Sequence, residues 1–124
     1  MIVVVDGNDG VGKSTLVSRL RAHGIEVKDR GVPTKMTDDV TVLGNSDEFY
    51  IILDAPVEVS RERLLMAGKD LSEKYHTASD LTHYRKRFLD VAKFLINCVI
   101  IDASRDEESV YQAALAVLQE KNIV

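Results

Sequence analysis

The sequence has little cysteine, few aromatic residues and no excess of positive charge, and these shortages exclude several classes of protein. With a single Cys among 124 residues, neither an intramolecular disulfide nor a multi-cysteine zinc site can form. The formal net charge of −4 argues against a protein that coats nucleic acid through a broad basic surface. No apolar run approaches the roughly 20 residues that cross a bilayer, and no segment resembles a signal peptide. We therefore expect a cytoplasmic protein that binds neither nucleic acid nor membranes.

The composition is otherwise that of an ordinary folded domain, with 45% hydrophobic and 29% charged residues. At about 150 residues per domain, residues 1–124 should form one domain. A chain of this length buries roughly two-thirds of the surface that it exposes when unfolded, which is enough for a core of its own.

Short unbroken apolar runs alternate with longer stretches of helical periodicity. Residues 1–5 (MIVVV) and 49–53 (FYIIL) are typical of strands that are covered on both faces. Residues 25–28 and 98–101 predict two further strands, and residues 40–43 predict a weak one.

Four helices are expected between or after these strands. The first follows a glycine-rich turn and should end near Gly24, and the second should begin at Pro56. The third carries an apolar stripe with steps of three and four residues: Leu81, Tyr84, Phe88, Val91 and Leu95. Tyr84 and Phe88 could stack on a base, but because they lie on this stripe we assign both to core packing. Ser104 and Glu107 form a capping box that should open the last helix. This alternation predicts a three-layer α/β domain with a small, mainly parallel sheet.

The strongest chemical signal is the segment at residues 7–14 (GNDGVGKS), which matches the pattern G-x-x-x-x-G-K-S/T at every fixed position. Glycines allow successive main-chain N–H groups to turn around phosphate oxygens, and the following helix adds its positive dipole end. Lys13 can reach the β- and γ-phosphates, the Ser14 hydroxyl can bind Mg²⁺, and Thr15 can donate near the α-phosphate. The predicted nucleotide-binding residues of this segment are Asp9, Gly10, Val11, Gly12, Lys13, Ser14 and Thr15.

Three stretches in this order resemble the thymidylate kinase family. They are residues 6–15 (DGNDGVGKST), residues 53–59 (LDAPVEV) followed by 62–64 (ERL), and residues 99–104 (VIIDAS) followed by 108–110 (ESV). The resemblance implies a P-loop nucleotide kinase fold and an enzyme that uses ATP and Mg²⁺. It also implies phosphoryl transfer to a small-molecule nucleotide, a deoxynucleoside monophosphate. Because members of this family commonly form dimers, a homodimer is part of what the resemblance implies.

The resemblance also implies roles for residues outside the glycine-rich segment. Asp9 would face the acceptor sugar, and Lys69 stands where the family's closing lid carries an arginine, within a candidate lid at residues 68–79. Arg105 follows the last predicted strand, where the family places the donor adenine.

Asp29 and Arg30 follow the second predicted strand, and in a parallel sheet that end opens onto the same edge as the glycine-rich turn. Asp29 could hold a Mg²⁺-bound water or orient the acceptor, and Arg30 could bridge the donor and acceptor phosphates. We therefore place Lys13, Asp29, Arg30 and Lys69 in the catalytic set. Further positive charge for the nucleotide and the acceptor is expected from Arg63 and Arg85.

The chain departs from the family's pattern in its central region. The family's R-E-P-G-G segment is absent, and its D-R-Y/F/H segment is reduced to Asp29 and Arg30, followed by Gly31. Two alternatives to a monophosphate kinase therefore stay open. One is a deoxynucleoside kinase, in which Asp29 would act as a base, and the other is an ATP-binding module that lacks catalysis.

Overall fold

The computed structural model describes residues 1–33 and 44–124 and contains, within them, a four-stranded sheet. Its strands are β1 (Ile2–Gly7), β2 (Val27–Asp29), β3 (Glu48–Asp54) and β4 (Cys98–Asp102). They lie side by side in the order β2-β1-β3-β4, and every neighbouring pair is parallel. The sequence-based expectation of a parallel sheet is confirmed, whereas the weak strand expected at residues 40–43 lies outside the described residues.

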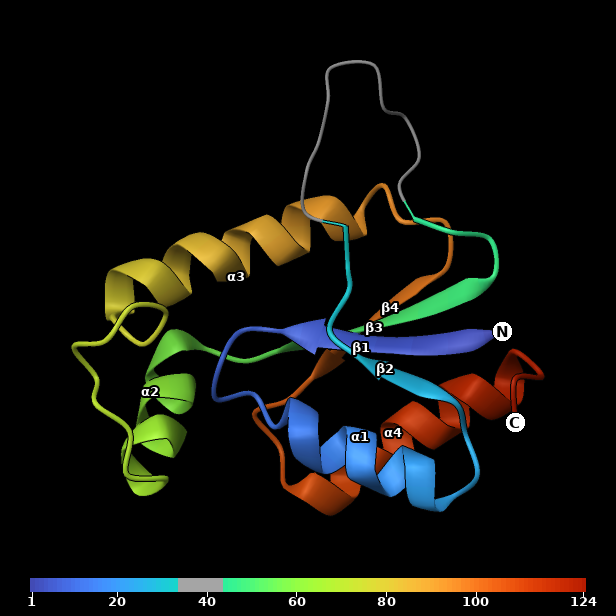
Figure 1. Ribbon diagram of the computed structural model, residues 1–124, viewed down its shortest axis with the longest axis horizontal. Coiled ribbons are helices and arrows are strands. Elements are labelled where there is room, and N and C mark those ends of the chain that lie inside the picture. Colours follow the sequence, from blue (N-terminus) through green and yellow to red (C-terminus); the bar gives the residue numbers. More distant parts are fainter. Residues whose placement is uncertain (34–43) are drawn as a thin grey trace.

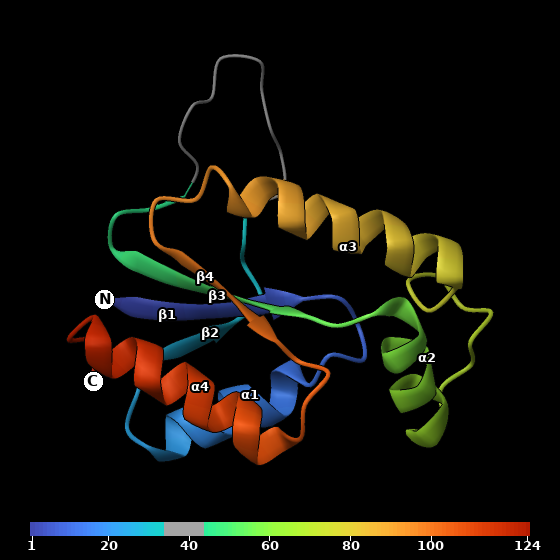
Figure 2. The same cartoon turned by 180° about the vertical axis from the view of Figure 1, so that it is seen from behind.

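Helices cover both faces of this sheet. They are α1 (Lys13–Ala22), α2 (Val57–Met66), α3 (Ala78–Ala92) and α4 (Glu107–Glu120). Figures 1 and 2 show α1 and α4 against one face and α3 along the other, with α2 beyond the carboxyl ends of the strands. This α/β arrangement is compatible with a three-layer fold. Among the described residues, no helix has the length and apolar character needed to cross a bilayer.

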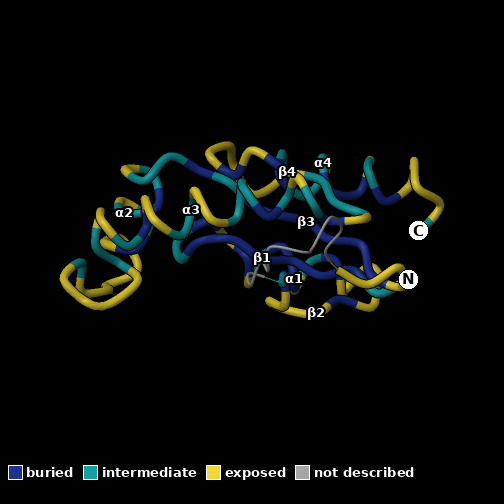
Figure 3. The backbone as a smooth tube through the Cα atoms, turned by 90° about the horizontal axis from the view of Figure 1, so that it is seen from above, coloured by how far each residue is buried: buried dark blue, intermediate teal, exposed yellow. Residues whose placement is uncertain are grey.

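The core is divided by the sheet into two clusters, and the alternating side chains of β1 contribute to both. Val3 and Val5 belong to the cluster under α1 and α4, whereas Val4 belongs to the cluster under α3. All three valines are fully buried, as are Ile51 and Leu118. The central strands are buried along nearly their whole length in Figure 3. The unbroken apolar runs in the sequence therefore do mark strands that are covered on both sides.

The predicted capping box at the start of the last helix is wrong. Asp106 caps α4, because its Oδ1 accepts a hydrogen bond from the Ser109 main-chain N at 2.8 Å. The Ser104 hydroxyl instead donates to Asp102 Oδ1 at 2.6 Å, within the turn that follows β4. Asp and Ser are both good helix caps, so the sequence pattern alone did not separate two candidates two residues apart.

Helix α3 begins at Ala78, so the last two residues of the candidate lid at residues 68–79 belong to the helix. The Thr77 Oγ1 accepts a hydrogen bond from the Asp80 main-chain N at 3.1 Å, and α3 starts at Ala78. The connection between α2 and α3 is therefore residues 67–77. The helix then ends at Ala92, although Leu95, the last member of the apolar stripe, is still buried.

A polar network at the amino end of β3 links this strand to β2 across β1. Glu48 Oε1 accepts from Lys28 Nζ at 2.8 Å, and Glu48 Oε2 accepts from the Tyr50 hydroxyl at 2.8 Å. The Tyr50 oxygen in turn accepts from the Asn45 main-chain N at 2.8 Å. The hydrogen bond from Lys28, followed by that from Tyr50, lowers the pKa of Glu48 below its ordinary value of 4.5.

This network predicts an acid-sensitive contribution to stability. A folded-state pKa below the unfolded value means that Glu48 stabilises the fold above pH 4.5 and loses this effect as the pH falls through the folded pKa. Glu48→Gln should lower the free energy of unfolding by about 1 kcal/mol at neutral pH, and by progressively less toward about pH 3. Urea unfolding of both proteins across this range measures the difference. A difference that does not change with pH would show that the Glu48 charge is not the cause.

Candidate functional site

The glycine-rich loop, residues 7–12, connects the carboxyl end of β1 to the start of α1 and is packed tightly against α2. Gly10 has a φ of +80°, and a Cβ added there would lie 2.5 Å from the main-chain oxygen of Ser60 on α2. Gly12 has a φ of +91°, but a Cβ added there would meet nothing within 4 Å. The loop therefore needs glycine at position 10 for both space and conformation, and at position 12 for conformation alone.

Lys13 lies across this loop with its ammonium group almost buried. Its Nζ donates to the main-chain oxygens of Gly7 at 2.6 Å and Asn8 at 3.0 Å. Burial lowers the pKa of Lys13, and the carboxylates of Asp6 and Asp9 act in the opposite direction. The side chain thus holds a desolvated positive charge at the mouth of the loop, where a bound anion would meet it.

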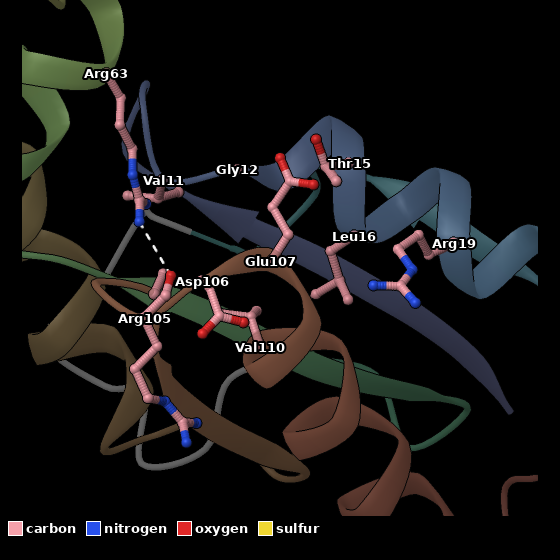
Figure 4. Close-up of a pocket in the computed structure, with 11 residues that line it drawn as sticks. Val11, Gly12, Thr15, Leu16, Arg19, Arg63, Arg105, Asp106, Glu107 and Val110 are labelled. Carbon is pink, nitrogen blue, oxygen red and sulfur yellow. Dashed lines mark hydrogen bonds between the residues drawn. The ribbon is translucent and has the colours of Figure 1, made fainter.

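A first cavity of about 300 Å³ lies on the α1 and α4 side of the loop. In Figure 4, Thr15, Leu16 and Arg19 project from α1, and Arg63 and Arg105 close the opposite side. Arg63 Nη2 donates to the main-chain oxygen of Arg105 at 3.2 Å, so these two predicted residues meet in space although 42 positions separate them. The structure therefore brings both to the same cavity as the glycine-rich loop and α1.

A second cavity of about 390 Å³ opens directly above the loop. It shares Gly12 and Thr15 with the first cavity, so the two spaces adjoin. The residues lining it include most of the predicted site: Asp9, Gly10, Gly12, Lys13, Ser14, Thr15, Arg30 and Lys69. Lys13, Arg30 and Lys69 come from three different segments and bring three positive charges to one space.

A third cavity of about 250 Å³ continues from the second past Asp9 and Arg30. Its far side is aromatic, because Tyr75, Tyr84 and Phe88 line it. The assignment of Tyr84 to the core is therefore wrong, since it is half-buried, lines the cavity and contacts the Tyr75 ring in a tilted arrangement with ring centroids 5.3 Å apart. Phe88 does pack on the core, as predicted, but it also contributes to the cavity wall.

Asp9 lies where the second and third cavities meet, and Lys13, Arg30 and His76 approach its carboxylate. Its Oδ1 is 3.8 Å from Lys13 Nζ and 3.7 Å from an Arg30 nitrogen, while its Oδ2 is 3.2 Å from His76 Nε2. Each of these groups belongs to a different part of the chain. Asp9 is thus the common partner of two cationic side chains, Lys13 and Arg30, and of the His76 ring.

Two predicted residues do not join this arrangement. Asp29 is exposed at the end of β2 and lines none of the three cavities. Arg85 is bound to another carboxylate, because its Nε and Nη2 donate to the two oxygens of Asp54 at 2.8 and 3.1 Å. These hydrogen bonds to Asp54 raise the pKa of Arg85. Arg85 therefore fastens α3 to the end of β3 and does not line the cavities.

The predicted metal ligands, Ser14 and Asp29, are not part of a larger cluster. In residues 1–33 and 44–124, no group of three His, Cys, Asp or Glu side chains has an arrangement that could hold a metal ion. Ser14 is exposed and lines the second cavity, so its hydroxyl is accessible there.

Asp6 and His76 also shape the site, although neither was predicted to belong to it. Asp6 is buried and accepts three main-chain hydrogen bonds, from Gly7 at 2.9 Å and from Gly31 and Val32 at 3.1 Å each. It thereby binds the segment after β2 to the start of the glycine-rich loop. His76 reaches Asp9 from the loop between α2 and α3. A polar residue immediately before the glycine-rich motif was a usable signal for Asp6, whereas no spacing pointed to His76.

Comparison with known proteins shows a distant likeness. No family model matches the chain. The Bifunctional cordycepin biosynthesis cluster protein 3 of Cordyceps militaris is 29% identical over an alignment 114 positions long, and the match covers 70% of this chain. The match covers 13% of that much longer protein, so the likeness concerns one part of it.

The packing of the glycine-rich loop on α2 predicts different costs for alanine at its two glycines. Gly12→Ala should lower the free energy of unfolding by about 1 kcal/mol, because only left-handed backbone strain is added. Gly10→Ala should lower it by about 3 kcal/mol, because its Cβ must also displace the Ser60 carbonyl or the loop itself. Urea unfolding of both variants provides the comparison, and equal losses would contradict the tight contact between the loop and α2.

Proposed function

We propose that this chain is a P-loop nucleotide kinase that transfers a phosphoryl group from Mg–ATP to a deoxynucleoside monophosphate. The observation that carries the proposal is the series of three adjoining cavities that meet at the glycine-rich loop. Phosphoryl transfer between two substrates requires one site for the donor and one for the acceptor, with positively charged groups where the phosphoryl group passes between them. The motif at residues 7–14 would supply this positive charge in the second cavity, through Lys13.

On the donor side, the first cavity would take the adenosine part of ATP and the second its phosphates. Arg63 and Arg105 would border the adenosine, and Thr15 lies where the two cavities adjoin. Lys13 would exchange its bonds to the Gly7 and Asn8 carbonyls for bonds to phosphate oxygens. Because Lys13 is already desolvated, its charge acts strongly on a phosphoryl group that carries negative charge.

On the acceptor side, the third cavity would hold a nucleoside base among Tyr75, Tyr84 and Phe88. Asp9 would face the sugar, and Arg30 would contact the acceptor phosphate and the transferred group, since it lines both the second and third cavities. Lys69 lines the second cavity from the loop between α2 and α3, so it can add positive charge there. The reaction then depends on position and charge, with no covalent enzyme intermediate.

The residues present fit a magnesium ion that arrives with the nucleotide. Mg²⁺ usually keeps several waters and takes one or two protein oxygens together with phosphate oxygens, so a cage of protein carboxylates is not required. The exposed Ser14 hydroxyl would be one such ligand, and the ion would neutralise charge on the phosphates. Asp29 would act only through a water, because its side chain lies outside the second cavity.

A deoxynucleoside kinase is the second candidate, and the charge of the third cavity favours it. Two carboxylates, Asp6 and Asp9, balance two cations, Lys13 and Arg30, so this space is also suited to an uncharged nucleoside. The relative in Cordyceps is named a cordycepin biosynthesis cluster protein, which is compatible with a role for this chain in small-molecule metabolism.

The experiment that tests the proposal is ADP release from Mg–ATP across a panel of deoxynucleosides and their monophosphates. We expect turnover with at least one monophosphate. Turnover with nucleosides alone would replace the proposal with the deoxynucleoside kinase, and ATP binding without turnover would leave a binding module. Lys13→Ala should weaken ATP binding by roughly 100-fold, since a buried, hydrogen-bonded charge is lost. Unchanged ATP affinity in a folded Lys13→Ala protein would contradict the assignment of the phosphate site.

The position of Arg30 gives a separate prediction about the phosphoryl transfer step. Arg30→Ala should reduce kcat by roughly 100-fold while changing ATP affinity little, because its charge would act mainly on the phosphoryl group in transfer. Arg21→Ala is a suitable control, since Arg21 Nη2 donates to the Val27 carbonyl at 2.9 Å and lines none of the three cavities. Equal, small effects of Arg30→Ala on kcat and ATP affinity would mean that Arg30 is only a surface charge.

A further inference from the structure

The first cavity is lined by several charged side chains, and two of them are already engaged by other parts of the protein. Arg19 forms an ion pair with Glu108 at 2.7 Å, and its guanidinium lies over the Tyr111 ring, 3.9 Å from the ring centre. The two oxygens of Asp106 accept hydrogen bonds from the main-chain N and the hydroxyl of Ser109, at 2.8 and 3.0 Å. These contacts hold the Arg19 and Asp106 side chains at the cavity wall.

Glu107 lines the same cavity, but its carboxylate is not engaged. It is the first residue of α4, and within the part of the chain that the structure describes its carboxylate has neither a hydrogen bond nor an ion pair. Figure 4 shows its side chain extending from α4 toward Thr15 on α1, with Arg63 and Arg105 on the opposite side of the cavity. Two carboxylate oxygens are therefore available to a ligand at the end of the cavity nearest the glycine-rich loop.

A nucleoside triphosphate bound as proposed above would bring its sugar to this place. Thr15 lies where the first and second cavities adjoin, so the phosphates would lie on one side of it. The base would lie on the other side, next to Arg63 and Arg105. Because the sugar joins the base to the first phosphate, it must occupy the space between them, which Glu107 faces.

Of the three parts of a nucleotide, the sugar of a ribonucleotide suits a carboxylate best. Ionised phosphates have no hydrogen to donate and repel a carboxylate. The 2′- and 3′-hydroxyls of ribose are neighbours, and both can donate to the two oxygens of one carboxylate. An acidic side chain binds the ribose 2′-hydroxyl in the same manner in dinucleotide-binding folds.

We propose that Glu107 binds the two ribose hydroxyls of the donor nucleotide and thereby selects ribonucleoside triphosphates over their deoxy forms. This inference deepens the function proposed above and rests on it. A nucleotide without these hydroxyls would cover the Glu107 carboxylate and leave it without a hydrogen-bond donor, which is unfavourable. Since the proposed acceptor is itself a deoxynucleotide, Glu107 would also act against its binding in the donor cavity.

The test is isothermal titration calorimetry of the whole protein with ATP and with 2′,3′-dideoxy-ATP, in the presence of Mg²⁺ and without an acceptor. We expect wild type to bind ATP roughly tenfold more tightly than the dideoxy nucleotide. In Glu107→Ala, ATP should bind more weakly, and the ratio of the two affinities should fall to about one. The dideoxy nucleotide should bind this variant at least as tightly as wild type, because a negative charge near its phosphates is lost.

Glu120→Ala is the matched control. It removes the same charge from the last residue of α4, which lines none of the three cavities, so it should keep the wild-type ratio. A Glu107→Ala protein that binds both nucleotides more tightly by the same factor would overturn the inference, since the carboxylate would then only repel phosphates.

The wild-type protein alone separates this inference from the proposed function, whether or not the variants fold. Equal affinity of wild type for ATP and 2′,3′-dideoxy-ATP would overturn the role of Glu107 and leave the proposed nucleotide site in place. If wild type binds neither nucleotide, the proposed function is contradicted, and the role of Glu107 is overturned with it.

Discussion

The candidate site depends on one buried carboxylate at the end of the first strand. Asp6 accepts three main-chain hydrogen bonds, one from the glycine-rich loop and two from the segment that follows β2. A buried carboxylate is unfavourable unless such donors satisfy it, so the two segments must stay together if the chain is to fold as described. This constraint brings Arg30 beside Asp9 and places the second and third cavities next to one another.

The parallel arrangement of the strands brings further segments to the same place. Because β2 and β3 flank β1 in the same direction, their carboxyl ends reach the same edge of the sheet as the glycine-rich loop. Helix α2 then begins just beyond β3 and packs Ser60 against Gly10. The loop is therefore supported by neighbours on both sides, and Lys13 can hold a desolvated charge in a defined position.

Much of the fold could be predicted from the sequence, because its signals are local. The runs at residues 1–5 and 49–53 are short, apolar and rich in β-branched or aromatic residues, as is typical of doubly covered strands, and they became β1 and β3. The order of strands and helices among the described residues was also correct. One prediction failed because two neighbouring residues, Ser104 and Asp106, are both good helix caps. Another failed because residues of one apolar helix stripe pack on the core at some positions and line a cavity at others. Tyr84 shares the helical spacing of core residues but lies beside a cavity instead.

The sequence by itself determined the parallel α/β sheet and the glycine-rich loop with Lys13 and Ser14 at its end, because hydrophobic periodicity and glycine spacing act over a few residues. Only the tertiary structure decided which distant side chains meet around that loop. It brought Arg63 to Arg105 and His76 to Asp9, and it paired Arg85 with Asp54. These pairs join segments 31 to 67 positions apart, so their contacts depend on chain direction and packing, which no local pattern encodes.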